Sequence, residues 1–374
     1  MNWTHSRNVL RRPLQVGEDV NEDLFGGLPL PAVPAQQERP ASSTPSGKPA
    51  RSQSVQPTRA DDALQALAAR LPTNLYFGTS SWAYPGWNGM VYDGEYGDSL
   101  LSRKGLAAYS RHPLLRAAGI DRGFYGPTPL ADYLSYAAQV PDGFRFLVKA
   151  PASVCDAWLR GSDGAGRLAN AAFLDAEIAV RDFITPATSG LGSKCGPLLF
   201  QLSPMGALAD SAVFLERLDA FLGALPPLDP SLTPHACYTV ELRDPALLTP
   251  RYIRLLRRHG VRFCLAARDR LPPVPRQAAA QALMDEETPG PLVLRWMLHA
   301  GRPYAFAEKL YAPFDRIVDD DPDTRHAIAD VVARTLRAGQ PAIVIVSNNA
   351  EGCAPISCVR LAEAIAARLE AGSR

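Results

Sequence analysis

Two charged residues lie at the ends of apolar stretches, where an uncompensated charge is costly. Lys149 follows Phe-Leu-Val, and Glu241 follows Tyr-Thr-Val. Burial disfavours the charged form of either side chain, and such groups suit general acid and base catalysis. The alternative is a buried ion pair that only stabilises the fold. We expect Glu241 to act as the acid or base, and Lys149 as an electrostatic stabiliser or a second acid or base.

Arginine and amide side chains accompany this pair. Arg243 lies two residues after Glu241, so both face one side of a regular strand. Arg243 is therefore expected to orient the carboxylate or to bind a substrate anion, and Arg295 is a second candidate for anion binding. Gln201 and Asn348 also follow apolar runs. We expect these two amides to orient the substrate.

Large aromatic residues follow the first apolar run of the folded part. Trp82, Tyr84 and Trp87 form either a stacking surface for a sugar or a base, or a packed loop that covers the domain. Tyr125 ends a later run in the same way. We expect Trp82 and Tyr125 to contact the substrate.

The segment 348–355 connects the last apolar run to the last helical pattern. Backbone N–H groups at the start of a helix bind phosphate, and the two asparagines and Gly352 of this segment fit that use. Glu351 opposes it unless its side chain points away or pairs with Arg295. The alternative is a polar turn, with Pro355 at the first helical position.

The sequence indicates no preformed metal site and assigns no cofactor. Cys353 and Cys358 with His326 do not have the spacing of zinc ligands, so a metal would have to bind through carboxylates. There is also no G-x-S-x-G motif of a serine hydrolase.

The elements that must position these residues alternate between strand and helix. Eight runs read as strands, several of them continuously apolar, as in strands that are covered on both faces. They span 75–78, 119–125, 144–149, 198–202, 238–242, 262–266, 292–296 and 342–346. Helical periodicity is clearest in the intervening segments 130–140, 212–225, 250–259, 324–338 and 355–369. In the first of these, Leu130, Tyr133, Leu134 and Ala137 are expected to form the buried face.

This alternation predicts an α/β fold, a TIM-like (β/α)8 barrel, over residues 73–374. A doubly wound open sheet is the alternative, but the sequence has no G-x-G-x-x-G motif and no P-loop to favour it. In barrels of this type the chemistry lies at the carboxyl ends of the strands. The candidate residues end or follow strands, so the architecture brings them to one mouth.

Residues 1–72 are expected to be a disordered N-terminal tail with a short helix near 61–71. The segment up to about residue 60 is rich in Pro, Ser, Gln and Arg and poor in aromatic residues, so it buries too little apolar surface to fold. Residues 24–28 (Leu-Phe-Gly-Gly-Leu) are a candidate motif for a protein partner. The alternative is a solvated tail without a partner.

The amino-acid composition argues against nucleic acids and membranes as binding partners. The net charge of +1 gives no basic footprint of a nucleic-acid-binding protein, and no apolar run approaches the length of a membrane span. Six scattered cysteines without a C-x-x-C pair fit reduced thiols in the cytoplasm. A small-molecule ligand is the expected partner.

Six blocks of sequence together resemble the YecE-like family, known as domain of unknown function 72. They are Gly78-Thr-Ser-Ser-Trp82-x-Tyr84-x-x-Trp87, Phe124-Tyr125, Pro141-Asp-Gly-Phe144-Arg-Phe146-Leu-Val-Lys149-Ala-Pro, Phe200-Gln201-Leu202, Val240-Glu241-Leu242-Arg243 and Asn348-Asn-Ala-Glu351-Gly352-x-Ala354-Pro355. The resemblance covers roughly residues 75 to 370. It implies a TIM-like barrel and supplies no reaction.

The chain departs from the family pattern at two places. The second strand of the family commonly reads Val-Glu-x-Asn-x-Thr-Phe-Tyr, whereas here the glutamate is absent and Asp121 replaces the asparagine. After the Glu-Leu-Arg block, the usual His-Pro-x-Trp is Asp244-Pro245-Ala-Leu247. The missing glutamate argues against a shared two-carboxylate mechanism, unless Asp121 substitutes for it.

Three functions fit these observations. The first is an enzyme, of hydrolase, lyase or isomerase type, that acts on a small polar or anionic substrate at the mouth of the barrel. The second is a non-catalytic binding protein for a phosphate-containing or nucleotide-like ligand. The third is a scaffold that is recruited through its N-terminal tail.

Overall fold

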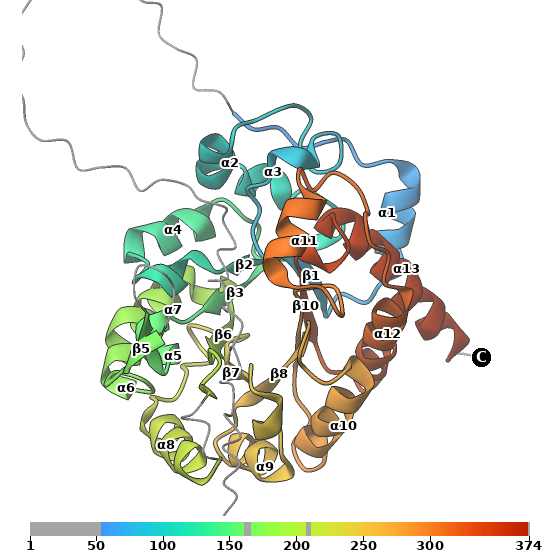
Figure 1. Cartoon of the computed structure of the whole chain (residues 1–374). Helices are drawn as coiled ribbons and strands as arrows, with labels where there is room; N and C mark the ends of the chain where they lie inside the picture. Colours follow the sequence, from blue (N-terminus) through green and yellow to red (C-terminus); the bar gives the residue numbers. More distant parts are fainter. Residues whose placement is uncertain (1–53, 161–165, 207–210, 373–374) are drawn as a thin grey trace, which may run out of the picture.

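Each of the eight strands expected from the sequence is present, and together they close into a barrel. The computed structural model describes residues 54–160, 166–206 and 211–372. The barrel strands are β1 (Leu75–Thr79), β2 (Leu115–Ile120), β3 (Arg145–Lys149), β6 (Cys195–Gln201), β7 (Cys237–Glu241), β8 (Arg262–Ala267), β9 (Leu292–Trp296) and β10 (Ala342–Val346). Neighbours are parallel in the order β1-β10-β9-β8-β7-β6-β3-β2 (Figure 1). The (β/α)8 barrel is confirmed.

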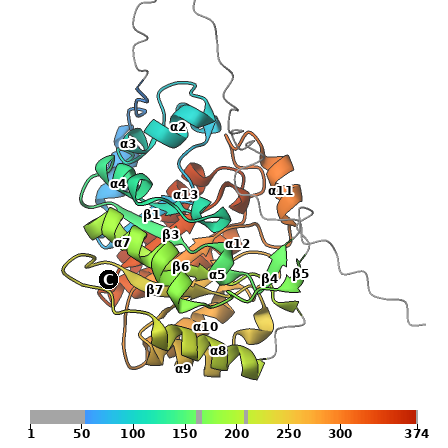
Figure 2. The same cartoon turned by 90° about the vertical axis from the view of Figure 1, so that its left-hand side faces the viewer.

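Helices surround the barrel wall in chain order (Figure 1). They are α1 (Asp62–Ala69), α2 (Asp98–Lys104), α3 (Leu106–Tyr109), α4 (Leu130–Ala138), α5 (Ala152–Cys155), α6 (Ala176–Ala179), α7 (Thr185–Leu191), α8 (Ser211–Ala224), α9 (Pro250–Arg258), α10 (Val274–Asp285), α11 (Tyr304–Tyr311), α12 (Pro322–Arg337) and α13 (Ala354–Ala371). A hairpin of β4 (Trp158–Arg160) and β5 (Gly166–Ala169) and helix α11 lie at one end of the barrel (Figure 2). The sequence did not indicate the hairpin or α11.

None of the described helices is both long and apolar enough to cross a lipid bilayer.

The second strand was predicted too late in the chain. The expected run 119–125 contains only the end of β2, and Arg122–Tyr125 form a 3₁₀ turn. Alanine and glycine dominate the true strand and are weak strand formers, which hides it in the sequence. Gly119 is required there, because a Cβ atom on it would lie 2.9 Å from the carbonyl oxygen of Ser80.

The predicted buried face of α4 was right for Tyr133 and wrong for its two leucines. Leu130 and Leu134 are 45% and 52% exposed, whereas Tyr133 and Tyr136 are buried. The helix turns its tyrosines inward because the Tyr136 ring packs edge-on against Trp82, with centroids 5.1 Å apart, and its hydroxyl accepts a hydrogen bond from Arg122. Two large amphipathic rings thus displace the leucines that periodicity alone favoured.

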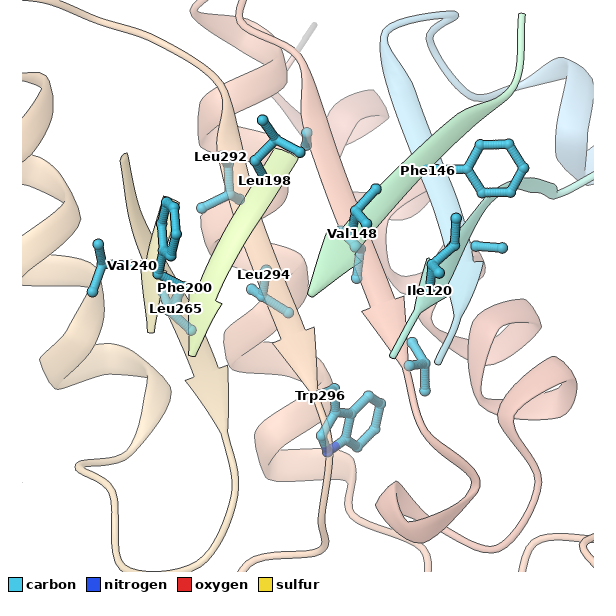
Figure 3. Packing of buried hydrophobic residues seen from close by; sticks show 14 of the residues in the cluster. Ile120, Phe146, Val148, Leu198, Phe200, Val240, Leu265, Leu292, Leu294 and Trp296 are labelled. Atoms are coloured by element: carbon cyan, nitrogen blue, oxygen red, sulfur yellow. The ribbon is translucent and has the colours of Figure 1, made fainter. Parts of the chain in front are cut away.

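Among the described residues, the apolar core has two main parts, separated by the barrel wall, and a small third cluster at α11. Outward-facing strand residues pack against the helices and form the larger part; Figure 3 shows Ile120, Phe146, Val148, Leu198, Phe200, Val240, Leu265, Leu292, Leu294 and Trp296. The smaller part fills the barrel with inward-facing residues, which include Ala117, Leu147, Leu199, Cys264 and Val293. The strands therefore carry apolar side chains on both faces, as a parallel barrel requires.

Residues 54–60 belong to the segment for which the sequence predicts a tail, and the structure places them on the domain. Val55 is 7% exposed, and Pro57 pairs in antiparallel fashion with Tyr92. Thr58 N–H donates to the carbonyl of Val91 over 3.0 Å. The expected disorder of residues 1–53 lies outside the described residues.

The core predicts the cost of opening a cavity at Phe200. This buried ring contacts Phe183, Phe221 and Tyr238, with centroids 5.6, 5.1 and 6.2 Å away. We expect Phe200→Ala to lower the free energy of unfolding by about 3–5 kcal/mol in urea titrations. Leu134→Ala, at an exposed position of α4, is the control and should change it by less than about 1 kcal/mol. Equal losses in both variants would contradict this packing.

Candidate functional site

Polar side chains replace the apolar filling of the barrel at the carboxyl ends of its strands. Asp121 directly follows β2, Gln201 and Glu241 end β6 and β7, and Arg295 is the fourth residue of β9. Gln201 and Arg295 lie two residues beyond the inward-facing Leu199 and Val293 and so face inward too. With Arg243, which follows β7, these residues form what we call the mouth network.

Arg295 is the centre of the mouth network. Its Nη1 donates to Gln201 Oε1 over 2.8 Å and to Glu241 Oε2 over 2.9 Å. Its Nη2 donates to Asp121 Oδ2 over 2.8 Å. The side chain has no solvent exposure. One guanidinium group therefore connects residues from β6, β7, β9 and the end of β2.

The two carboxylates keep Arg295 charged. Burial opposes the protonated form of its guanidinium, but the negative charges of Asp121 and Glu241 outweigh that effect and raise the pKa of Arg295 above its ordinary value. A buried charge is tolerated when it is paired and hydrogen-bonded in this way. Arg295 thus lies in the expected place but is engaged by protein side chains.

Glu241 lies between two arginines. Its Oε1 is 2.8 Å from Arg243 Nε, and its Oε2 accepts from Arg295. Arg243 lies beyond the end of β7, so the two do not share a strand face, but their side chains are in contact as expected. The Cys264 thiol also contacts Glu241 Oε2, at 3.8 Å. Burial, and then the charge of Glu241, raise the pKa of Cys264 well above its ordinary value, so this side chain stays a thiol.

Lys149 reaches the same interior from β3. It is 2% exposed and follows the inward-facing Leu147 by two residues. Its Nζ lies 3.9 Å from the centroid of the Phe124 ring, within the range of a cation–π contact. Because β3 pairs with β6 and β6 with β7, Lys149 and Glu241 are two strands apart on the same side of the wall.

The aromatic loop after β1 is packed into the domain. Trp82 is 5% exposed, and its Nε1 donates to the carbonyl of Ser102 over 3.3 Å. Trp87 is fully buried and lies against Tyr84, with ring centroids 4.8 Å apart. These contacts agree with the packing alternative for the three aromatic residues. The side chain of Tyr125 lies outside the described part of the structure.

Asn348, in the loop after β10, bonds to this packed loop and, within the described part of the chain, makes no hydrogen bond to the mouth network. Its Oδ1 accepts from Trp87 Nε1 over 3.2 Å and from the N–H of Ala354 over 2.8 Å. Ala354 is the first residue of α13, so Asn348 satisfies one of the backbone donors at the start of that helix. The arrangement agrees with the polar turn and cap that the sequence left open.

Glu351 points away from the barrel mouth. It forms an ion pair of 2.9 Å with Arg325 and accepts from the N–H of Asp321, also over 2.9 Å. These contacts connect the loop before α13 to the start of α12. Burial raises the pKa of Glu351 above its ordinary value.

Sequence reasoning left two members of the site out of its candidate residues. Asp121 was named only as a departure from the family pattern. Its position near the end of a strand is the signal by which it could have been included among the candidate residues. Cys264 had no such signal, because a cysteine inside an apolar strand reads as core. Within the described ranges, no group of three or more His, Cys, Asp or Glu side chains could hold a metal ion.

Comparisons with known proteins agree on the family. The family described as "Protein of unknown function DUF72" matches residues 76–373. A DUF72 protein of Enterococcus faecalis V583 has a similar structure with a TM-score of 0.53 at 16% identity, over 78% of this chain and 95% of that chain. One from Thermotoga maritima MSB8 has a TM-score of 0.52 at 17% identity, over 77% and 98%. Identities this low show the shared fold alone. No curated protein matches the chain.

The mouth network predicts a large loss of stability when its central cation is removed. Arg295→Met leaves the carboxylates of Asp121 and Glu241 buried without their main partner, and we expect it to lower the free energy of unfolding by about 3–5 kcal/mol. Adding Asp121→Asn and Glu241→Gln to it should restore part of that loss in urea titrations. Arg254→Met, at an exposed position of α9, is the control. A loss no larger than the control's would show that the network is not stabilising.

Glu351 predicts a pH dependence of stability. Its pKa in the folded state lies above the ordinary value of 4.5, so the folded protein binds more protons than the unfolded chain there. This contribution to stability is present at lower pH and is lost as pH rises through the folded pKa. Relative to Glu351→Gln, the wild type should therefore become less stable as the pH rises above 4.5, as measured by urea unfolding. The exposed Glu363→Gln should show no such trend, and a parallel pH profile for Glu351→Gln would refute the expectation.

Proposed function

The chain belongs to the DUF72 family, and from this premise we propose that it is an enzyme that acts on a small anionic substrate at the carboxyl-terminal mouth of its barrel. One observation carries the proposal: charged side chains from β3, β7 and β9 and from the end of β2 meet inside a wall that is otherwise apolar. In barrels of this architecture, that mouth is the face on which enzymes build their active sites.

Stability alone gives a poor reason for this arrangement. Buried ion pairs lose most of their attraction to the cost of removing charges from water, and apolar side chains of similar size often stabilise a fold as well or better. Glu241 and Arg295 have no solvent exposure, and Asp121 and Lys149 are each 2% exposed. Binding of a ligand to these charged side chains would explain why they are buried at the mouth.

The positions suggest separate roles for the cations. Arg295 is held by Gln201, Glu241 and Asp121, so its role is to position the carboxylates and the amide. Arg243, oriented through Nε by Glu241, is proposed to bind the anionic group of the substrate. Gln201 would orient the substrate beside it.

Proton transfer is assigned to the two residues that the sequence singled out. Glu241 is proposed as the general acid or base, and Lys149 as a second acid or base or as a stabiliser of developing negative charge. Asp121 Oδ1 is buried without a hydrogen-bond partner among the described residues. It is therefore proposed to accept a hydrogen bond from a hydroxyl or amino group of the substrate.

A non-catalytic binding protein for a phosphate-containing or nucleotide-like ligand is the second candidate. It is favoured by the contacts of Glu241, whose two carboxylate oxygens both lie against guanidinium nitrogens. A carboxylate in that position serves to orient arginines for an anion without giving or taking a proton.

The cysteines favour a reducing compartment. All six are free thiols in the structure, and five of them are buried. Disulfides are rare where thiols are kept reduced, so we propose a cytoplasmic location for the protein.

The ligand can be identified by native mass spectrometry of the protein purified from its own host. We expect a small-molecule mass on the wild type and its absence from the Glu241→Ala, Arg243→Ala double variant. Persistence of that mass on the double variant would place the binding site elsewhere. Arg251→Ala, Arg254→Ala on the exposed face of α9 is the matched control and should keep the ligand.

Glu241→Gln then separates the two candidate functions. The substitution keeps the shape and removes proton transfer, so turnover of the identified compound should fall by about 10²–10⁴-fold while its Kd changes little. Unchanged turnover would remove Glu241 from the chemistry. Binding without turnover in the wild type would establish the second candidate.

A further inference from the structure

Helix α11 has an apolar face that the described part of the chain leaves uncovered. Phe306 and Leu310 are 51% and 42% exposed, and they lie on the same side of the helix because they are four residues apart. Pro303 before the helix and Pro313 after it are also exposed. We call Pro303, Phe306, Leu310 and Pro313 the α11 face.

The opposite side of α11 fixes the helix to the domain. Ala307 and Tyr311 are buried against Leu298, which follows β9. The Tyr311 hydroxyl donates to Asp319 Oδ2 over 2.8 Å. The helix is thus held by one side at the end of the barrel where Figure 2 shows it, and the exposed Phe306 and Leu310 lie on its other side.

The described chain begins against the loop that follows β1. Val55, Gln56 and Pro57 lie along residues 91–93, and the N–H of Asp93 donates to the carbonyl of Gln56 over 3.1 Å. Residues 91–93 belong to the loop after β1. Any chain that precedes Ser54 therefore joins the domain at that loop.

The same loop contacts the chain that leaves α11. Tyr84 meets the Phe314 ring edge-on, with centroids 5.7 Å apart. Gly86 lies so close to Pro313 that a Cβ atom on it would be 1.9 Å from the Pro313 carbonyl oxygen. The starting point of the tail and the α11 face are thus connected through one packed loop.

We propose that residues 24–28 of the tail, Leu-Phe-Gly-Gly-Leu, dock on the α11 face of the same chain. Leu24, Phe25 and Leu28 are the only large apolar side chains between residues 21 and 29, and they match the chemistry of the exposed face. Acidic residues precede them at positions 18, 19, 22 and 23, and the exposed Lys309 adjoins Leu310 on α11. The surface offers apolar contact with a cation beside it.

The intervening chain is long enough for this contact. Residues 29–53 separate the motif from the domain. A random coil of that length has a root-mean-square span of about 25–30 Å, and the fully extended chain reaches about 80 Å. Tethering over such a length gives an effective concentration of about 1 mM, so a weak contact suffices to keep the motif bound.

The docked motif lies on the rim of the mouth, next to the loop after β10. The N–H of His299 donates to the carbonyl of Asn349 in that loop over 2.9 Å. This proposal does not depend on the chemistry assigned to the mouth network.

Photo-crosslinking of the full chain tests the contact. We would introduce Phe25→p-benzoylphenylalanine, irradiate, and map the crosslinked peptides by mass spectrometry. The expected product is an intramolecular crosslink between position 25 and residues 303–313, at a yield at least about fivefold higher than from the same probe at Ser43. The Ser43 probe controls for random encounters of the tail.

A second variant keeps the test decisive. Phe306→Ser, Leu310→Ser changes only half-exposed side chains, and it should lower the crosslink yield to that of the Ser43 probe while the thermal unfolding curve is retained. Crosslinks from position 25 that map elsewhere would overturn the proposal. Crosslinks between two chains, seen as a dimer band in a denaturing gel, would also overturn it, because they would make a second copy the partner.

Discussion

The arrangement of the mouth depends on the buried positive charge of Arg295. A guanidinium group in the interior of a barrel is stable only if oxygen atoms surround it, and here Gln201, Glu241 and Asp121 provide them. Each of these partners comes from a different strand end. The charge therefore fixes where three other polar side chains can lie, and through Glu241 it fixes the position of Arg243.

The fold could be predicted because its signal is local. The runs 292–296 and 342–346, which are apolar apart from Arg295, match β9 and β10 residue for residue. The prediction of strand bounds and buried faces failed where the local sequence pattern was weak or fitted more than one arrangement. Strand β2 has alanine or glycine at three of its six positions, and α4 buries Tyr136 while it exposes two leucines. In both cases tertiary contacts, to Ser80 in one and to Trp82 in the other, decided the outcome.

The site could be predicted only in part, because its pairings span the barrel. The strand-end rule identified Gln201, Glu241 and Arg295 from the sequence, and the structure brings them together. It could not show that Arg295 binds Asp121, since nothing local relates residues that are 174 positions apart. Asn348 obeys the same rule but turns to Trp87 and α13, because a helix start offered its oxygen a backbone partner.

The separation of Asp121 from Arg295 also has a consequence for synthesis on the ribosome. Asp121 leaves the exit tunnel long before β9 has been translated, so a nascent chain that has formed β1, β2 and β3 carries a carboxylate without its counter-ion. The open edge of such a partial sheet is an additional hazard for aggregation. Because the chain is synthesised from its N-terminus, we expect the barrel to close late. The N-terminal strands should stay loosely associated until the C-terminal third of the chain has been synthesised.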